Sequence, residues 1–397
     1  MLINIVKVQN YRSLANIALE VGNINVLFGP NGVGKSSLLD TLWFLRDCAI
    51  RGVDQASTFR SHGVGMRWVG AEEPANIRIE FETNTATYQV EIGYSSGRIE
   101  PYVGEKLFSK TRKASLIDRK VGSDKADFYH LNLKQMATLV LREPEKLALT
   151  RYVDFEDGAG EAYDIDRILR FLHLYKAREA DLFGLKRSGS ESGHQTWLWE
   201  RGQNLFSVLR NLKDRRGLDN RYDTIVGYMR KAFPGDFLDV FLEQTGPNSV
   251  YGSFQQEGLR DLIQASGVSD GHLQMLLNLT SLFAEGDDRP STLMFDEPEI
   301  SLHPLALAVF AEAVKFAAQQ CNKQTLLATH SPVLMSQFDP HNVYVLQKQV
   351  NRSTQIQCIS ELAGIQDLLE EYALGSLYMA EAVAPQSPHP EPFVKES

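Results

Sequence analysis

The length and composition of the chain are those of a globular protein, with 397 residues, 43% of them hydrophobic and 23% charged, enough for one large domain or two of ordinary size. Its net charge of −9 excludes a global attraction to nucleic acid, so such a contact would need a local basic patch. The sequence has no apolar run of about 18 residues, no secretory signal and only three widely spaced cysteines, so we expect a cytoplasmic protein without a membrane span, disulfides or a zinc site.

The N-terminal segment predicts strands over residues 3–9 and 17–21, and the second alternates apolar and polar residues like a half-buried antiparallel strand. A buried strand over residues 24–28 leads into Gly-Pro-Asn-Gly-Val-Gly-Lys-Ser, which fits the phosphate-loop pattern. Leucines at helical spacing follow over residues 37–45, so the loop lies between a strand and a helix N-terminus. This arrangement predicts a nucleotide site.

Each residue type in this loop has a chemical reason to be there. Glycines let successive backbone N–H groups turn inward and form an anion-binding nest. Lys35 can reach the β- and γ-phosphates, and the hydroxyl of Ser36 can bind Mg²⁺. The predicted nucleotide-binding residues here are Gly29, Pro30, Asn31, Gly32, Val33, Gly34, Lys35, Ser36 and Ser37.

A β-hairpin over residues 77–82 and 88–94 is the next clear element, because both segments alternate apolar and polar residues around a polar turn. Basic residues then crowd between Lys106 and Lys125, and two interpretations stay open for them. They could form a patch for a DNA or RNA backbone, or they could be a solvated loop face. The basic residues are Lys106, Lys110, Arg112, Lys113, Arg119, Lys120 and Lys125.

The middle of the chain looks mainly helical from about residue 131 to 232, with no sustained heptad repeat. We therefore expect a mainly helical insertion over residues 97–235, ended by Pro234 and Gly235 and followed by a strand over residues 237–241. The last segment, over residues 381–397, is rich in proline and is expected to be a disordered tail.

Three later features complete the predicted site. The apolar strand over residues 291–295 ends in Asp296, which can hold Mg²⁺ opposite Ser36, and in Glu297, which can deprotonate an attacking water. The buried strand over residues 325–328 leads to His330, which could contact the γ-phosphate. Ser269, Asp270 and Gly271 open a helix over residues 272–283, where a serine or aspartate is also an ordinary N-cap.

Taken together, these motifs resemble the ABC-type ATPase head of the SMC, RecF and OLD proteins, and the standalone AAA-type core ATPases grouped with them in bacteria. The matching segments lie at both ends of the chain. They are VQNYRSL at residues 8–14, the loop 29–36, Ser269 to Gly271, DEPEISLHP at 296–304, ATHSP at 328–332 and YALGSL at 372–377. The resemblance implies an α/β P-loop NTPase fold with an antiparallel β subdomain, whose core is one discontinuous domain over residues 1–96 and 236–380.

The resemblance also implies roles for the matched residues, with ATP and Mg²⁺ as ligands. Residues 29–36 would be the Walker A loop, Asp296 the magnesium-linked carboxylate, Glu297 the general base and His330 the switch histidine. Ser269, Asp270 and Gly271 stand where the family has its signature motif, which caps the γ-phosphate bound to a partner subunit. The implied assembly is therefore a homodimer that sandwiches ATP.

Some positions depart from the family pattern. Asp270 replaces a small residue and would place an acid near the phosphate of the other subunit unless its side chain turns away. His303 stands where an aspartate is usual, so its role is open. The glutamine loop has no clear match, although Gln55 and Gln135 are candidates.

The function we expect is a Mg²⁺-dependent ATPase that dimerises on ATP and acts in DNA maintenance or in defence against foreign DNA such as phage. The sequence after His330 is too short for a TOPRIM-type nuclease domain, so a nuclease activity would come from a partner chain. One alternative is an ATP-gated scaffold that regulates an effector protein without binding DNA. Another is a transporter ATPase subunit, which the long middle segment argues against.

Overall fold

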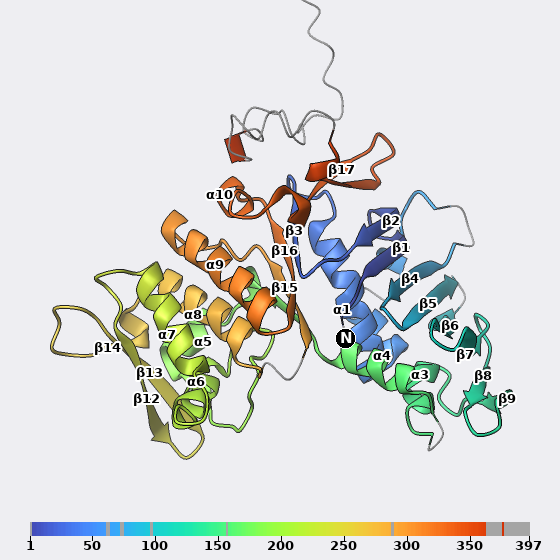
Figure 1. Cartoon of the computed structure of the whole chain (residues 1–397), viewed down its shortest axis with the longest axis horizontal. Helices are drawn as coiled ribbons and strands as arrows, with labels where there is room; N and C mark the ends of the chain where they lie inside the picture. Colours follow the sequence, from blue (N-terminus) through green and yellow to red (C-terminus); the bar gives the residue numbers. More distant parts are fainter. Residues whose placement is uncertain are drawn as a thin grey trace, which may run out of the picture.

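The computed structural model describes residues 2–60, 64–71, 75–95, 98–155, 158–286, 290–362 and 375–376. Within these residues the chain forms three β-sheets with helices between and around them (Figure 1). No helix in these ranges is long and apolar enough to cross a bilayer. The expected tail over residues 381–397 lies outside the described residues, as does most of the segment 372–377.

A six-stranded sheet carries the phosphate loop and has the order β10-β15-β16-β3-β17-β18. Its strands are β3 (Ile24–Phe28), β10 (Leu172–Lys176), β15 (Ser291–Asp296), β16 (Lys323–Thr329), β17 (Val343–Lys348) and β18 (Thr354–Cys358). All pairs are parallel except that of β17 with β18. Every residue of β3 and β16 is buried, polar residues such as Asn25 and Gln324 included, because a parallel sheet is covered on both faces.

An eight-stranded antiparallel sheet has the order β2-β1-β4-β5-β6-β7-β8-β9. Its strands are β1 (Ile5–Tyr11), β2 (Leu14–Glu20), β4 (Ile77–Glu82), β5 (Ala86–Ser95), β6 (Arg98–Ser109), β7 (Ala114–Arg119), β8 (Lys125–His130) and β9 (Gln135–Val140). The predicted strands near the N-terminus and the predicted hairpin are thus present and belong to one sheet, in which β1 pairs with both β2 and β4.

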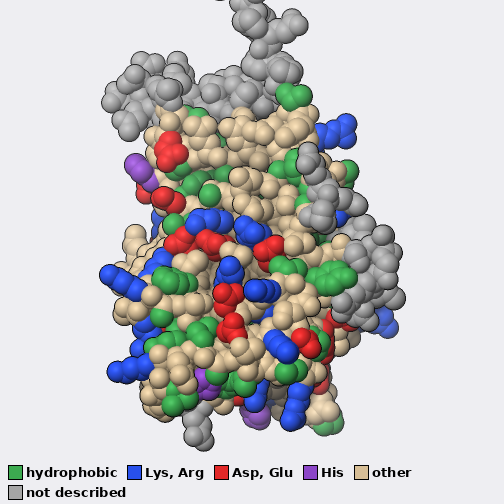
Figure 2. Space-filling view, turned by 90° about the vertical axis from the view of Figure 1, so that its right-hand side faces the viewer, with side chains coloured by type: hydrophobic (Ala, Val, Ile, Leu, Met, Phe, Trp, Pro, Cys, Tyr) green, Lys and Arg blue, Asp and Glu red, His purple; other side chains and the backbone are tan. Residues whose placement is uncertain are grey.

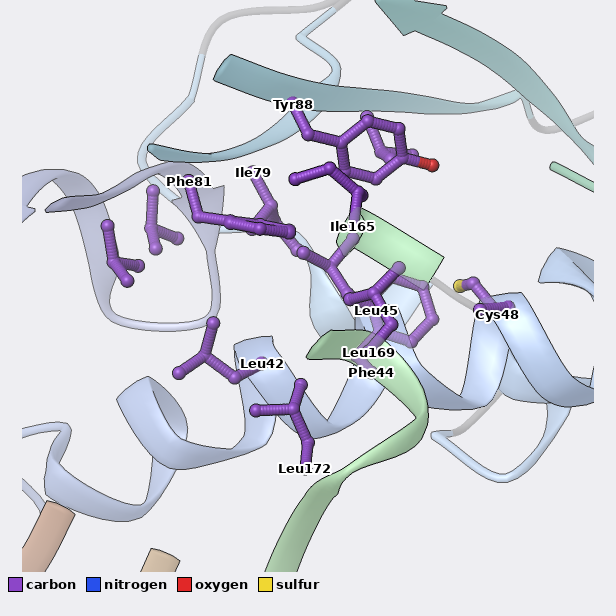
Figure 3. Close-up of a cluster of buried hydrophobic side chains, with 14 of the residues drawn as sticks. Leu42, Phe44, Leu45, Cys48, Ile79, Phe81, Tyr88, Ile165, Leu169 and Leu172 are labelled. Atoms are coloured by element: carbon purple, nitrogen blue, oxygen red, sulfur yellow. The ribbon is translucent and has the colours of Figure 1, made fainter. Parts of the chain in front are cut away.

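Helix α1 (Lys35–Arg51) lies between this sheet and the parallel sheet, together with α4 (Gly160–Arg170) (Figure 1). Figure 3 shows their shared hydrophobic cluster, in which Leu42, Phe44 and Leu45 of α1 meet Phe81 and other side chains of the antiparallel sheet. Two short helices border it, α2 (Val53–Thr58) and α3 (Ala148–Tyr152). Packing of α1 in this cluster therefore fixes the position of the helix that follows the phosphate loop.

The opposite face of the parallel sheet is covered by a second group of elements around another hydrophobic cluster. Its helices are α5 (Leu182–Ser188), α6 (Leu205–Asp214), α7 (Arg221–Ala232), α8 (Asp270–Phe283), α9 (Pro304–Gln320) and α10 (Pro332–Met335). A small sheet contains β11 (Ser190–Glu191), β12 (Asp239–Gly246), β13 (Ser249–Gln255) and β14 (Ile263–Gln264). Five 3-10 turns complete the described chain, at Val64–Met66, Ala177–Glu179, Ala265–Gly267, Pro340–Asn342 and Ile359–Glu361.

The expected insertion over residues 97–235 is not one mainly helical unit. Strands β6 to β9 continue the antiparallel sheet as far as Val140, and β10 joins the parallel sheet beside β15. Strands β6 to β9 pair with their neighbours in sequence as successive hairpins, whereas β10 is a short strand that stays extended through pairing with the distant β15. The strand expected over residues 237–241 begins at Asp239 and continues to Gly246.

Candidate active site

The parallel sheet brings the predicted site residues to one edge. Phe28, the last residue of β3, pairs with Thr329 of β16, and Ala328 pairs with Asp296 of β15. The carboxyl ends of these three strands therefore lie side by side, which is where open α/β sheets bind ligands. The phosphate loop, Asp296 and the segment that contains His330 all leave the sheet at this edge.

The backbone of the phosphate loop requires glycine at two positions. Gly29 has φ 153° and Gly34 has φ 111°. A Cβ atom at Gly29 would lie 2.4 Å from the backbone oxygen of Leu346, and one at Gly34 would lie 2.5 Å from Oγ1 of Thr354. The same Thr354 hydroxyl donates to the Val33 carbonyl at 2.7 Å. Strand β18 thus fixes the curvature of the loop.

Lys35 is buried at the first position of α1, with 5% of its surface exposed. Its ammonium group donates to the carbonyl oxygens of Gly29 at 2.6 Å and Pro30 at 2.9 Å. Burial lowers the pKa of Lys35, and the charges of nearby carboxylates, above all Asp296, oppose that shift. An anionic phosphate would favour the charged ammonium in the same way.

Ser36 and Asp296 form the expected pair, because the Ser36 hydroxyl donates to Oδ1 of Asp296 at 2.9 Å. Burial raises the pKa of Asp296, the hydrogen bond from Ser36 lowers it, and the charge of Glu297 raises it further. A divalent cation would favour the ionised form of the Asp296 carboxylate. The Ser36 hydroxyl oxygen and the Asp296 carboxylate oxygen are the hard ligands that Mg²⁺ prefers. The two residues therefore fit a magnesium ion.

Glu297 follows directly and has a positive φ of 55°. Its backbone N–H donates to Ala328 at 2.8 Å, which turns the side chain over the end of β16. One carboxylate oxygen lies 3.7 Å from Nδ1 of His330, and the other accepts a hydrogen bond from Nε of Arg178. The predicted base and the predicted histidine are thus neighbours.

Glu299, which the sequence analysis did not assign, positions the histidine. Its Oε1 atom accepts from the Thr329 hydroxyl at 2.7 Å and from the backbone N–H of His330 at 3.0 Å, and lies 3.3 Å from Nδ1 of that residue. Glu299 is buried, whereas the His330 side chain is 42% exposed and faces solvent. The only sequence indication was its place two residues after the base.

A cleft of about 190 Å³ opens beside Ser36 and Asp296. It is lined by Arg12, Ser36, Asp40, Lys176, Arg178, Glu179, Asp296 and Glu297. The sequence analysis did not assign its three cations to the site. Arg12 lies in the matched N-terminal segment. Lys176 ends β10 and Arg178 follows it, and this strand lies in a region that the sequence predicted to be helical, so it gave no indication of a site. A larger cleft of about 650 Å³, between the end of α1 and the β9–α3 segment, contains none of the predicted site residues.

None of the signature residues Ser269, Asp270 and Gly271 lines this cleft. The Ser269 side chain caps α8 by accepting from the backbone N–H of His272 at 3.4 Å. The carboxylate of Asp270 accepts from Nζ of Lys186 in α5 at 2.5 Å, so the charge of the unusual acid is neutralised within the chain. Within one chain these side chains are therefore engaged by α8 itself and by α5.

The other open positions are also placed. His303 caps α9, since its side chain accepts from the backbone N–H of Leu305 at 3.4 Å. Gln55 lies in α2 and Gln135 lies in β9, and neither lines the cleft at Ser36. The glutamine-loop candidates therefore have no support from the geometry.

Three of the seven basic residues between Lys106 and Lys125 have partners within the chain. Lys110 pairs with Glu82 at 2.7 Å and Arg112 with Glu161 at 3.1 Å, while Arg119 is buried and donates to backbone carbonyls. Figure 2 shows acidic and basic side chains interspersed on the face it presents. These ion pairs favour the interpretation as a solvated face over that of a phosphate-backbone patch.

Known proteins resemble this chain in sequence and in fold. The model of the family described as "AAA domain, putative AbiEii toxin, Type IV TA system" matches residues 24–336. Endonuclease GajA of Bacillus cereus (strain VD045) is 21% identical over 393 residues, which cover 91% of this chain and 60% of GajA. Protein ea59 of Escherichia phage lambda is 34% identical over 70 residues, 18% of this chain and 13% of ea59. The chain thus spans less than two thirds of either relative.

Among solved structures, an SMC head bound to the C-terminal winged-helix domain of ScpA superposes with a TM-score of 0.54. The superposition covers 91% of this chain and 99% of the SMC head, at 14% sequence identity. At that identity the likeness concerns the fold alone. The expected fold, an ABC-type P-loop ATPase head of the SMC and OLD kind, is confirmed.

Proposed function

This chain belongs to the family described as "AAA domain, putative AbiEii toxin, Type IV TA system", and from that premise we propose that it binds ATP with Mg²⁺ and hydrolyses it to ADP and phosphate. The observation that carries the proposal is the hydrogen bond between Ser36 and Asp296, with the Glu297 carboxylate beside it. A hydroxyl and two carboxylates from distant segments meet there at the end of a phosphate loop. The proposal places the protein in the cytoplasm, where ATP is available.

The residues of the proposed site have separate tasks. Lys35 and the loop amides bind the phosphates, and Ser36 and Asp296 hold Mg²⁺, which would offset the charge of the phosphate oxygens. Glu297 orients a water molecule and accepts its proton as the water attacks the γ-phosphorus and the bond to ADP breaks. His330, held by Glu299, contacts the transferred phosphate.

Glu297→Gln tests the assignment of the base. The amide cannot accept the proton, so we expect kcat to fall by about a hundredfold or more while ATP binding is retained. Steady-state phosphate release and equilibrium binding of ATP measure the two quantities. Glu312→Gln, at an exposed ion pair with Lys231, is the control and should hydrolyse normally. Normal turnover in Glu297→Gln would remove Glu297 from this role.

We further propose that two copies of the chain close on ATP, with Ser269, Asp270 and Gly271 of each copy acting on the nucleotide of the other. Ser269, Asp270 and Gly271 do not line the cleft within one chain and the Asp270 side chain is exposed, which leaves this segment available to act in trans. Glu297→Gln should therefore shift from monomer to dimer in sedimentation velocity when ATP and Mg²⁺ are added. A variant that binds ATP and remains a monomer would contradict the sandwich.

The biological role is proposed at a coarser level, as ATP-dependent control of a process that involves DNA, which includes defence against foreign DNA. The similarity to an endonuclease supports this role, although the chain spans 60% of that relative. A second candidate is an ATP-gated scaffold that controls a partner effector, and the internal ion pairs of Lys110 and Arg112 favour it. ATP turnover with and without duplex DNA separates them, because only direct binding predicts stimulation by DNA alone.

A further inference from the structure

The cleft holds a cation, Arg178, whose side chain contacts the proposed catalytic base. Arg178 lies in the turn Ala177–Glu179, directly after β10. Strand β10 pairs in parallel with β15 so that Lys176 is opposite Asp296. The residues that follow these two strands therefore leave the sheet together, which places Arg178 beside Glu297.

The other cations of the cleft are held by groups that take no direct part in the proposed chemistry. Arg12 pairs with Asp40 at 2.9 Å, and Asp40 is held in turn by the buried Arg60. Lys176 pairs with Glu179 at 2.8 Å. Arg178 differs from them, because its Nε donates to Oε2 of Glu297. Its side chain is 68% exposed, against 17% for Glu297, so it can move without disturbing the core.

Arg178 is exposed and lines the cleft, so its guanidinium is also available to a bound ligand. Ser36, Asp296 and Arg178 line the same cleft, so a phosphate group bound beside Ser36 would share that cleft with the guanidinium. A guanidinium presents several N–H donors in a planar fork that matches phosphate oxygens, and only Nε is used on Glu297. Nearby carboxylates, Glu297 foremost, raise the pKa of Arg178, so it stays charged.

We propose that Arg178 is a γ-phosphate-binding residue that exchanges the Glu297 carboxylate for the terminal phosphate when ATP is bound. This inference rests on the proposed function and adds to it a coupling between binding of the γ-phosphate and release of the catalytic base. While Arg178 holds Glu297, the base has one oxygen engaged by a cation and the other near His330. Transfer of the guanidinium to the γ-phosphate frees Oε2 for the attacking water. Release of the base is then linked to the presence of a third phosphate, which ADP lacks.

The test compares the binding of a non-hydrolysable ATP analogue with that of ADP, both with Mg²⁺. Arg178→Ala should bind the analogue about tenfold or more weakly than wild type, because it loses a charge-assisted contact to one phosphate. Its affinity for ADP should change by less than about twofold. Arg178→Lys keeps the charge and loses the planar fork, so its affinity for the analogue should lie between those of wild type and Arg178→Ala. Arg216→Ala is the matched control, because Arg216 is also an exposed arginine paired with an acid, Asp223, and neither residue lines the cleft. It should leave both affinities unchanged.

A double-mutant cycle tests the exchange itself. Glutamine at position 297 does not hold the guanidinium as an ion pair, so Glu297→Gln should bind the analogue several-fold more tightly than wild type. That gain should disappear in Arg178→Ala/Glu297→Gln. Persistence of the gain, or an equal loss for the analogue and ADP in Arg178→Ala, would overturn the exchange and leave ATP hydrolysis standing. A wild-type chain that bound neither nucleotide would overturn both proposals.

Discussion

At the scale of single residues, the signature segment is fixed by a close approach that only glycine allows. A Cβ atom at Gly271 would lie 2.6 Å from the backbone oxygen of Ser301, which cannot move away like the end of a flexible side chain. Ser301 itself has a positive φ of 65° in the turn after Glu297. The first turn of α8 thus packs directly on the segment that carries the proposed base.

Gly271→Ala should therefore destabilise the protein by about 1–3 kcal/mol, as overpacking does, and displace the signature segment from the turn. Thermal unfolding of the purified variant measures the first effect, and ATP-dependent dimerisation measures the second. Gly227→Ala in α7 is a matched control, since a Cβ atom at Gly227 would meet no atom within 4 Å and alanine favours a helix. Equal stability of Gly271→Ala and wild type would mean that the turn adapts.

Another residue-scale feature is a buried charge cluster at the opposite end of the parallel sheet. Glu285 shares a hydrogen bond with Nε2 of His173 at 2.9 Å and lies 3.7 Å from Nζ of Lys323. Burial would raise the pKa of Glu285, but the hydrogen bond from His173 and the charges of His173 and Lys323 lower it to about 2. The ionised carboxylate therefore stabilises the fold.

A lowered pKa in the folded state contributes stability above the unfolded value of 4.5, and that contribution is lost as pH falls towards about 2. Glu285→Gln should unfold at a lower denaturant concentration than wild type at pH 7, because breaking a buried charge pair costs about 3–5 kcal/mol. The difference should narrow as the pH is lowered from about 5 to about 3. Denaturant titrations at each pH measure the difference in unfolding free energy between wild type and Glu285→Gln. A difference that stays constant with pH would mean that the variant is destabilised by altered packing alone.

At the scale of elements, α5 and α8 are joined by the contact between Lys186 and Asp270. An acid at this place would repel the phosphates of a second copy, and the pairing at 2.5 Å offsets it. The local sequence could not show this, because 84 residues separate the two partners. A neutral residue at position 270 would not repel the phosphates, whereas this chain offsets the charge of Asp270 with a lysine from a neighbouring helix.

Lys186→Glu should leave the fold intact, since both side chains are partly exposed, and should weaken ATP-dependent dimerisation in the Glu297→Gln background. Two acids would then face the phosphates of the partner. The charge swap Lys186→Glu/Asp270→Lys should restore dimerisation, which excludes a loss through misfolding. Sedimentation velocity with ATP and Mg²⁺ is the measurement, and dimerisation unchanged in Lys186→Glu would show that this face stays away from the nucleotide.

At the scale of the whole molecule, the parallel sheet separates two hydrophobic clusters, and the proposed site takes residues from both sides. Helix α1, which carries Lys35 and Ser36, packs with the antiparallel sheet, whereas α8 and α9 pack on the opposite face. The residues after β15 and β16 join the two sides at the edge of the sheet. A ligand bound there would tie together elements from both sides of the sheet.

ATP with Mg²⁺ should therefore raise the melting temperature by a few degrees, since a ligand at about 100 times its Kd stabilises the folded state by about 2.7 kcal/mol. EDTA should remove most of this gain, because Ser36 and Asp296 are proposed to hold the phosphates through the metal. Differential scanning fluorimetry measures the shifts, and Lys35→Ala should show none with nucleotide. A shift that EDTA leaves unchanged would exclude Mg²⁺ from the site.

The sequence alone determined the parts of this protein that depend on neighbouring residues. Local spacing predicted the loop 29–36 with its flanking strand and helix, and the apolar strands before Asp296 and His330. It also predicted the two N-terminal strands and the hairpin of β4 and β5. Two buried strands that end in polar residues must place them at the same edge of a parallel sheet. The resemblance to ABC-type heads followed from these motifs, and the fold was confirmed.

Only the tertiary structure decided which distant segments meet. The sheet order places β10 beside β15 and so brings Arg178 to Glu297, from segments 119 residues apart. Successive hairpins also extend the antiparallel sheet to β9, in a region whose periodicity suggested helices. Strand pairing and ion pairs between remote residues depend on register and packing across the whole chain. Local sequence periodicity does not encode that register, because each short strand can satisfy its hydrogen bonds with many partners.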